Sequence, residues 1–103
     1  MTHSVIISPK AENDFTEIVL ELVELSPAKT EKFYFGCRKA MDSLATFPAR
    51  CPLVPESKKL KRQVRHLLYE QYRIVFKIED ETDTVKIIRV RHQKRRPLTK
   101  DDL

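Results

Sequence analysis

The sequence is short of glycine, cysteine and histidine, and each shortage removes a class of functional site. Gly36 is the only glycine, which excludes a glycine-rich phosphate loop and a G-x-S-x-G nucleophile turn. Cys37 and Cys51 form no C-x-x-C pair, so we expect two free thiols. The three histidines lie far apart, with no H-E-x-x-H motif and no cysteine–histidine spacing typical of zinc sites. We therefore expect neither a bound metal nor a cofactor.

Long apolar runs are missing as well. The longest contain only a few residues, whereas a helix that crosses a bilayer needs about 20, and no secretory signal opens the chain. We expect a soluble, cytoplasmic protein. With 103 residues, of which 41% are hydrophobic and 34% charged, the chain is predicted to form a single domain over residues 1–103 around one modest core.

Positive charge is concentrated in the second half of the chain. Residues 1–47 hold five Lys/Arg against seven Asp/Glu, whereas residues 48–103 hold fifteen against eight. The two halves therefore carry net charges of −2 and +7. This asymmetry indicates an anionic partner, whether nucleic acid, an acidic protein or a membrane surface, and by itself it does not choose among them.

The first half predicts a strand followed by two helices. The run Val5–Ile7 is typical of a short strand. The pairs Ser8-Pro9 and Ser26-Pro27 are typical helix starts, because serine caps the first turn and proline needs no N–H there. After each pair, apolar residues recur at helical spacing, which predicts two amphipathic helices in an antiparallel hairpin. The recurring positions are Ala11, Phe15, Ile18, Val19 and Leu22, then Phe33, Cys37, Ala40, Met41 and Leu44.

The second half predicts an irregular proline-containing segment and then strands over residues 64–69, 72–78 and 84–92. In the middle strand the two-residue period places Ile74 and Phe76 on one face, which we expect to be core, and leaves the other face partly exposed to water. Without glycine, the turns at 70–71 and 79–83 are expected to be loose. The predicted fold is α+β, in the order β-α-α-β-β-β, with the two-helix hairpin packed on a mostly antiparallel four-stranded sheet.

Two basic clusters hold ten of the twenty lysines and arginines within sixteen residues. In an antiparallel sheet we expect the start of strand 64–69 and the end of strand 84–92 to meet, so that both clusters form one footprint for phosphates or an acidic peptide. The alternative is a solvated basic surface that serves solubility alone. The candidate binding residues are Lys58, Lys59, Lys61, Arg62 and Arg65 in the first cluster, and Arg89, Arg91, Lys94 and Arg96 in the second, which also contains Arg95.

Metal-free RNA cleavage is the one catalytic reaction for which the chain has candidates. It requires proton transfer at the 2′-hydroxyl and the leaving oxygen, and cations to hold the charge on phosphorus. Arg73 and Arg95 could supply the charge and His92 the proton transfer, although a second histidine or an aligned carboxylate is missing from the same segment. The structural alternatives are strand-end packing for His92, and for Arg73 a stem lying along the sheet with its head paired to an acidic side chain.

Four stretches, SPKAENDF, LATFP, VRHLLYEQYRIVFKIED and IIRVRHQKRRPL, together resemble the RelE/ParE superfamily of bacterial toxins from type II toxin–antitoxin modules. The resemblance runs from about Val5 to Leu98. It implies a compact toxin that is held inactive by an antitoxin encoded beside it. RelE-like members of this superfamily cut mRNA on the ribosome, whereas ParE-like members poison DNA gyrase and are not nucleases.

Carried over onto this chain, the Tyr-Arg of the central strand falls on Tyr72 and Arg73, the arginine of the preceding strand on Arg65, and the H-x-x-R stretch on His92 and Arg95. The chain differs from the family in having glutamine at 71 and 93 where glycine is common. Its tail, residues 97–103, also has no tyrosine of the kind that RelE-like nucleases carry. The helix start and the long proline-containing loop resemble the ParE arm more closely.

The resemblance favours a ParE-like toxin of a plasmid-stabilisation module, which arrests growth by binding an essential target such as gyrase and is neutralised by its antitoxin. No membrane partner is expected. The alternative is a ribosome-dependent mRNA endonuclease in which Arg73 and Arg95 stabilise the phosphorane and His92 handles a proton. A third reading is a basic binding module without toxicity.

Overall fold

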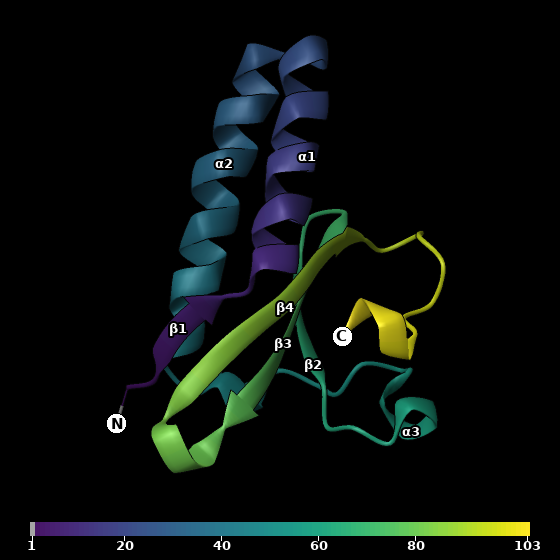
Figure 1. Ribbon diagram of the computed structural model, residues 1–103. Coiled ribbons are helices and arrows are strands. Elements are labelled where there is room, and N and C mark those ends of the chain that lie inside the picture. The colour runs from purple at the N-terminus through teal and green to yellow at the C-terminus, as the bar shows by residue number, and fades with distance from the viewer. Residues whose placement is uncertain (1) are drawn as a thin grey trace.

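The computed structural model describes residues 2–103 and confirms the predicted α+β order (Figure 1). Each predicted strand begins and ends within one residue of its observed bounds. Between the second helix and the second strand lie only short helical turns, among them α3 (Ser57–Leu60). The main elements are β1 (Ser4–Ile7), α1 (Pro9–Leu25), α2 (Pro27–Asp42), β2 (Arg65–Tyr69), β3 (Tyr72–Glu79) and β4 (Thr84–His92).

Both helices begin as the Ser-Pro pairs predict. The Ser8 hydroxyl accepts a hydrogen bond from the Ala11 N–H at 3.2 Å, and the Ser26 hydroxyl accepts one from the Lys29 N–H at 3.3 Å. Ser26 also ends α1, because its own N–H donates to the Leu22 carbonyl. One residue therefore closes the first helix and opens the second, and the two run side by side as an antiparallel hairpin (Figure 1).

The sheet has the strand order β1-β4-β3-β2. β3 is antiparallel to both of its neighbours and β1 is parallel to β4, so the sheet is mostly antiparallel as predicted. The register slips by one residue where Val75 pairs with Arg89 and Phe76 with Ile87, which makes Ile88 the extra residue of a β-bulge.

The expected meeting of the two basic clusters was wrong. β2 and β4 are both antiparallel to β3, so they run in the same direction. The end of β4 therefore lies level with the end of β2, through Tyr69, Tyr72 and His92, and not with its start. The expectation treated β2 and β4 as antiparallel to each other, but β3 lies between them and is antiparallel to both.

The face of the sheet under the helices carries the main core. Ile74 and Phe76 of β3 are fully buried there, while Tyr72 and Ile78 are partly buried against the same cluster. Every recurring apolar position predicted in the two helices belongs to this core or packs against it. Cys37 and Cys51 are free thiols, as predicted, and both are buried. Burial raises the pKa of the Cys37 thiol to about 12.

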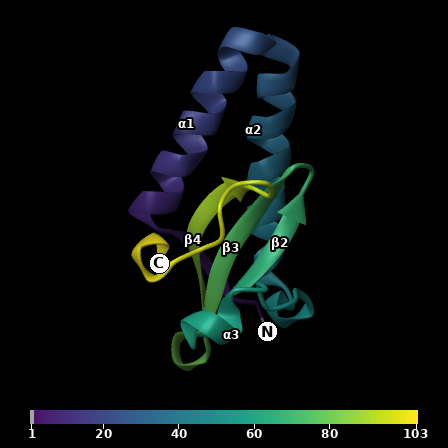
Figure 2. The same cartoon turned by 90° about the vertical axis from the view of Figure 1, so that its right-hand side faces the viewer.

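The opposite face is more buried than the sequence suggested. The irregular segment before β2 and the C-terminal tail fold across it (Figure 2). They close a second, smaller apolar cluster over Val75, which has no exposed surface. The expectation of a partly wet face was wrong here because the tail supplies a cover. The cluster consists of Val54, Leu60, Val64, Val75, Ile88 and Leu98.

The turns show how the chain manages without glycine. Tyr69 and Tyr72 pair directly, so residues 70–71 form a tight two-residue connection, and the prediction of a loose turn was wrong there. Glu70 adopts the left-handed conformation at φ 53°, which glycine normally supplies. The turn before β4 is longer, as predicted, and ends on Asp83 at φ 48°. Within residues 2–103, no helix is long and apolar enough to cross a membrane.

Candidate functional site

The ten clustered cations separate into exposed and buried groups. Arg65 is half-buried, and its guanidinium donates to the Cys51 carbonyl at 2.6 Å, so it holds the irregular segment against β2. Arg89 and Arg91 are engaged in ion pairs within the fold. The exposed members are Lys58, Lys59, Lys61 and Arg62 around α3, and Lys94, Arg95 and Arg96 in the turn after β4. Figure 1 shows α3 and the end of β4 at opposite ends of the sheet.

On the face away from the helices, Arg73 pairs with Glu56. The two guanidinium nitrogens lie 3.1 and 2.6 Å from the two carboxylate oxygens, a bidentate contact. Both side chains are nearly buried, with 8% and 12% exposure. The hydrogen bond from Arg73 is the largest cause that lowers the pKa of Glu56, to about 2. This is the acidic partner that the structural interpretation of Arg73 expected.

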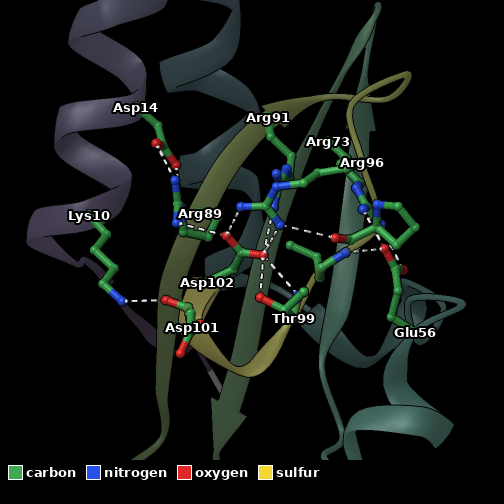
Figure 3. A network of polar contacts seen from close by, with 12 residues as sticks. Lys10, Asp14, Glu56, Arg73, Arg89, Arg91, Arg96, Thr99, Asp101 and Asp102 are labelled. Carbon is green, nitrogen blue, oxygen red and sulfur yellow. Dashed lines mark hydrogen bonds and ion pairs between the residues drawn. The ribbon is translucent and has the colours of Figure 1, made fainter.

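Asp102, in the last turn of the chain, is the centre of the network in Figure 3. Its carboxylate lies 3.4 Å from Arg89, 3.3 Å from Arg91 and 3.0 Å from Arg96, and accepts the Thr99 N–H at 2.8 Å. Although burial opposes ionisation, the hydrogen bonds from Thr99 and Arg96 and the nearby positive charge of Arg91 hold the pKa of Asp102 well below its usual range. One carboxylate of the tail thus serves three guanidiniums of the sheet and the following turn.

Asp14 of α1 joins the helix to the same network. Its two oxygens accept from Arg89 at 2.7 and 2.8 Å, and one also accepts the Val90 N–H at 3.0 Å. The hydrogen bonds that Arg89 donates to Asp14 raise the pKa of Arg89. Because Arg89 is next to the β-bulge, its side chain reaches both α1 and the tail.

Arg91 differs from Arg73, Arg89 and Arg96 in having no hydrogen bond from its guanidinium. Its side chain has no exposed surface, and none of its three guanidinium nitrogens finds a hydrogen-bond acceptor among the described residues. Asp102 approaches at 3.3 Å as an ion pair only. Burial is the largest cause of the lowered pKa of Arg91.

The three residues proposed for catalysis are not brought together. Tyr72 pairs with His92 and Arg73 with Arg91, so Arg73 projects to the opposite face of the sheet from His92. His92 and Arg95 line a cavity of about 230 Å³ that Arg73 does not line. Its wall also includes Arg91 and the carboxylates of Asp14, Glu17 and Glu21.

His92 is engaged as its structural alternative expected. Its ring packs edge-on against Tyr72 at a centroid distance of 5.5 Å. Its Nδ1 accepts the Lys94 N–H at 3.0 Å. Both contacts close the end of β4. Among the described residues, no group of three potential metal ligands gathers anywhere.

A groove of about 850 Å³ lies beside the arginine network on the same face. Its floor includes Val64 and Ile88, and the C-terminal Leu103 forms part of its wall. The lining side chains carry four positive charges and, among the described residues, no negative one. The cations are Lys10, Arg62, Lys77 and Lys86.

Sequence reasoning missed the three carboxylates that organise this face. Asp14 had a readable signal, since it stands three residues after Ala11 on the apolar stripe of α1, where an acidic side chain requires a buried partner. Asp102 had another, because Thr99-x-x-Asp102 is a capping-box spacing, and both of its hydrogen bonds form. Glu56 lies in an irregular segment with no local pattern.

The comparisons with known proteins agree with this fold. A family model described as the ParE toxin of the type II toxin–antitoxin system parDE matches residues 5–97. The chain is similar to a chain of the RelBE2 toxin–antitoxin complex from Mycobacterium tuberculosis, with 25% identity, a TM-score of 0.57 and coverage of 90% of this chain and 93% of that one. It also resembles a chain of the chromosomal ParDE system of P. aeruginosa, with 20% identity, a TM-score of 0.69 and coverage of 88% and 96%. No curated protein matches the sequence significantly.

Proposed function

Because the chain belongs to the ParE toxin family of type II toxin–antitoxin systems, we propose that it arrests growth by binding an essential cellular protein, with DNA gyrase as the first candidate. An antitoxin encoded beside it neutralises the toxin in the cytoplasm, and the pair serves plasmid stabilisation. Both similar structures come from toxin–antitoxin systems, which supports an antitoxin as the partner of this chain.

The observation that carries the proposal is the separation of the candidate catalytic residues. Cleavage of RNA needs the charge on phosphorus and the proton transfer within one site. Arg73 is buried against Glu56 and does not line the cavity that His92 and Arg95 share. Glu17 and Glu21 in that cavity would repel a phosphate. A binding function requires no such convergence.

The surface supports a protein partner. The seven exposed cations at the two ends of the sheet offer electrostatic attraction to an acidic protein. Large apolar side chains are also exposed on the helical hairpin, among them Leu20, Val23 and Phe35, at 53–65% exposure. Exposed apolar side chains beside charge are typical of protein-binding surfaces.

Two assays separate this proposal from an mRNA endonuclease. Purified toxin added to a gyrase supercoiling reaction is expected to inhibit it, while mRNA in a translation extract stays intact. Codon-specific mRNA cuts that vanish in His92→Ala and Arg95→Ala but persist in His3→Ala would contradict the proposal and establish the endonuclease. That alternative has one observation in its favour, the shared cavity of His92, Arg95 and Tyr72.

Toxicity itself is tested by expression with and without the neighbouring reading frame. We expect growth arrest when the chain is expressed alone and recovery when a short acidic partner is co-expressed. Unchanged growth on lone expression would favour a non-toxic binding module. Capture of the partner should weaken as salt rises toward a Debye length of about 3 Å at 1 M, because exposed charges carry part of the attraction.

A further inference from the structure

The C-terminal tail covers a set of guanidiniums that would otherwise face solvent. Arg73 and Arg91 are neighbours in the β3–β4 register and project from the same face of the sheet. The tail crosses this face (Figure 2) and places the Asp102 carboxylate among Arg89, Arg91 and Arg96 (Figure 3). The Asp102 carboxylate of the chain's own tail therefore occupies the position of a ligand among these arginines.

That ligand leaves the site incompletely satisfied. Arg91 is fully buried, yet it has only an ion pair at 3.3 Å and no hydrogen bond within the described chain. A buried charge without hydrogen bonds is unfavourable, whereas a charge-assisted bidentate contact, such as Arg73 makes to Glu56, is among the strongest that proteins form. A carboxylate that bonded Arg91 as Glu56 bonds Arg73 would therefore replace Asp102 with a gain.

We propose that Arg89, Arg91 and Arg96 form a carboxylate-binding site that Asp102 occupies in the free protein, and that an acidic segment of a protein partner binds there by displacing the tail. The inference goes beyond the proposed toxin activity and does not depend on which cellular target the protein has.

The tail also indicates what the displacing segment looks like. Leu98 is buried in the second apolar cluster, against Val54 and Val75 among others, and its N–H donates to Glu56 at 2.9 Å. Leu103 packs at the edge of the same cluster and forms part of the wall of the basic groove. A competitor would offer an apolar side chain, an acidic one four residues later and a further apolar one, the pattern of Leu98, Asp102 and Leu103. Additional acidic residues would fit the four cations of the groove.

A protein carboxylate fits this site better than a nucleic acid backbone. Asp14 of α1 and Glu56 of the irregular segment stay in place when the tail leaves, and they would repel the neighbouring phosphates of a polymer. The Arg91 side chain has no exposed surface, so a carboxylate on the thin, flexible stem of a glutamate or aspartate suits it better than the phosphate of a polymer backbone.

Displacement is feasible because the tail is held by few contacts. It consists of one 3₁₀ turn, Lys100–Asp102, and the few residues before it. Apart from Asp102, the tail is held by the apolar contacts of Leu98 and Leu103 and by three hydrogen bonds among the described residues. These run from the Leu98 N–H to Glu56 at 2.9 Å, from Lys10 to the Asp101 carbonyl at 2.8 Å and from Arg96 to the Pro97 carbonyl at 3.4 Å. Segments with few buried contacts open locally at low cost compared with global unfolding.

Asp102→Asn tests the proposal in the full-length chain, with Asp101→Asn as the matched control. Asp101 is the adjacent aspartate and is exposed, so both variants change the net charge equally. The probe is the synthetic peptide PLTKDDL, which has the sequence of residues 97–103. Because the neutral amide in Asp102→Asn holds the tail weakly, we expect this variant to bind the peptide about tenfold more tightly than Asp101→Asn does. The tail amides of Leu98 and Thr99 should also exchange hydrogen about tenfold faster in Asp102→Asn.

Equal peptide affinity and equal exchange in the two variants would overturn the proposal. So would displacement of the bound peptide by a single-stranded oligouridylate but not by an aspartate-rich peptide, which would make the site a nucleic-acid site.

If circular dichroism shows Asp102→Asn to be unfolded, Arg96→Gln replaces it. This change removes one of the three guanidiniums from the carboxylate at a side chain that is 57% exposed, and it should raise tail exchange in the same direction. Unchanged exchange there would count against the proposal.

Discussion

The two faces of the sheet are closed by different means. Under the helices, apolar side chains spaced along α1, α2, β3 and β4 interlock in one core. On the opposite face, a smaller apolar cluster shares the surface with four arginines and three carboxylates that come from five separate parts of the chain. The helix face is stabilised by buried area, which is non-directional, whereas the opposite face depends on particular partners.

The two faces of the sheet therefore differ in how they respond when a contact is changed. A buried apolar contact is lost gradually as side chains shrink, and its replacement by another apolar group is tolerated. A buried charge is stable only while its partner stays, and the partner can be exchanged for a chemically similar one. The helix face therefore fixes the fold, and the arginine face is suited to binding.

The largest expected effect tests the helix face. Phe76 has no exposed surface and lies in the centre of the main core. Phe76→Ala should lower the free energy of unfolding by about 4 kcal/mol, since the lost transfer energy is joined by a cavity that the core cannot fill. Urea denaturation followed by circular dichroism measures it. The same substitution at Phe47, which is 75% exposed, is the control and should change little. A loss below about 1 kcal/mol at Phe76 would show that this face can repack freely.

The next effect tests the opposite face. Glu56→Gln keeps the shape of the side chain but leaves the nearly buried Arg73 without its counter-charge. We expect the free energy of unfolding to fall by about 3 kcal/mol, because the unpaired guanidinium cannot reach water unless the tail moves. Glu79→Gln, whose side chain is 42% exposed, is the matched control. A similar loss of unfolding free energy in Glu56→Gln and Glu79→Gln would mean that burial does not strengthen the ion pair of Glu56 with Arg73.

The helix face could be read from the sequence because its signals are local. The spacing of Phe15 or Phe33 within a helix and of Ile74 and Phe76 within a strand is fixed by the geometry of one element. The Ser-Pro caps are local as well, and both were placed correctly. The mostly antiparallel pairing of the sheet was also predicted correctly. The relative direction of β2 and β4 was not, because it depends on two pairings, β2 with β3 and β3 with β4.

The arginine face could not be read in the same way. Arg89 finds Asp14 across 75 residues of sequence, and Arg73 finds Glu56 across 17, with no periodicity that connects them. The tail that covers this face contains no long apolar run, only Leu98 and Leu103 around a capped turn. Charge pairs between residues far apart in sequence leave no pattern in a single chain. The two basic clusters were therefore predicted to form one exposed binding surface, although Arg89 and Arg91 are paired within the fold.

A pH series tests whether the ionised carboxylate of Glu56 stabilises the face of the sheet that carries the arginines. The folded-state pKa of Glu56 is lowered from 4.5 to about 2, so its contribution is complete above the unfolded-state pKa and is lost as the pH falls toward 2. The stability advantage of the wild type over Glu56→Gln should therefore shrink by about 2 kcal/mol between about pH 5 and about pH 3. Urea midpoints of both proteins across this range measure it. A constant difference would mean that the carboxylate of Glu56 is not held ionised by Arg73.

The smallest expected effect separates burial from pairing. Lys32 and Glu70 form an ion pair at 3.6 Å, but their side chains are 76% and 47% exposed. Water and salt screen this pair, and ordering two long side chains costs conformational entropy, so a double-mutant cycle with Lys32→Ala and Glu70→Ala should give a coupling energy below about 0.5 kcal/mol. The same cycle with Arg73→Ala and Glu56→Ala should give a coupling several times larger, because each single variant leaves a nearly buried charge behind. Equal couplings would mean that the cover supplied by the tail does not exclude water from the arginine face. Its carboxylates would then be ordinary surface partners of the arginines, and the tail would have no ligand-like role.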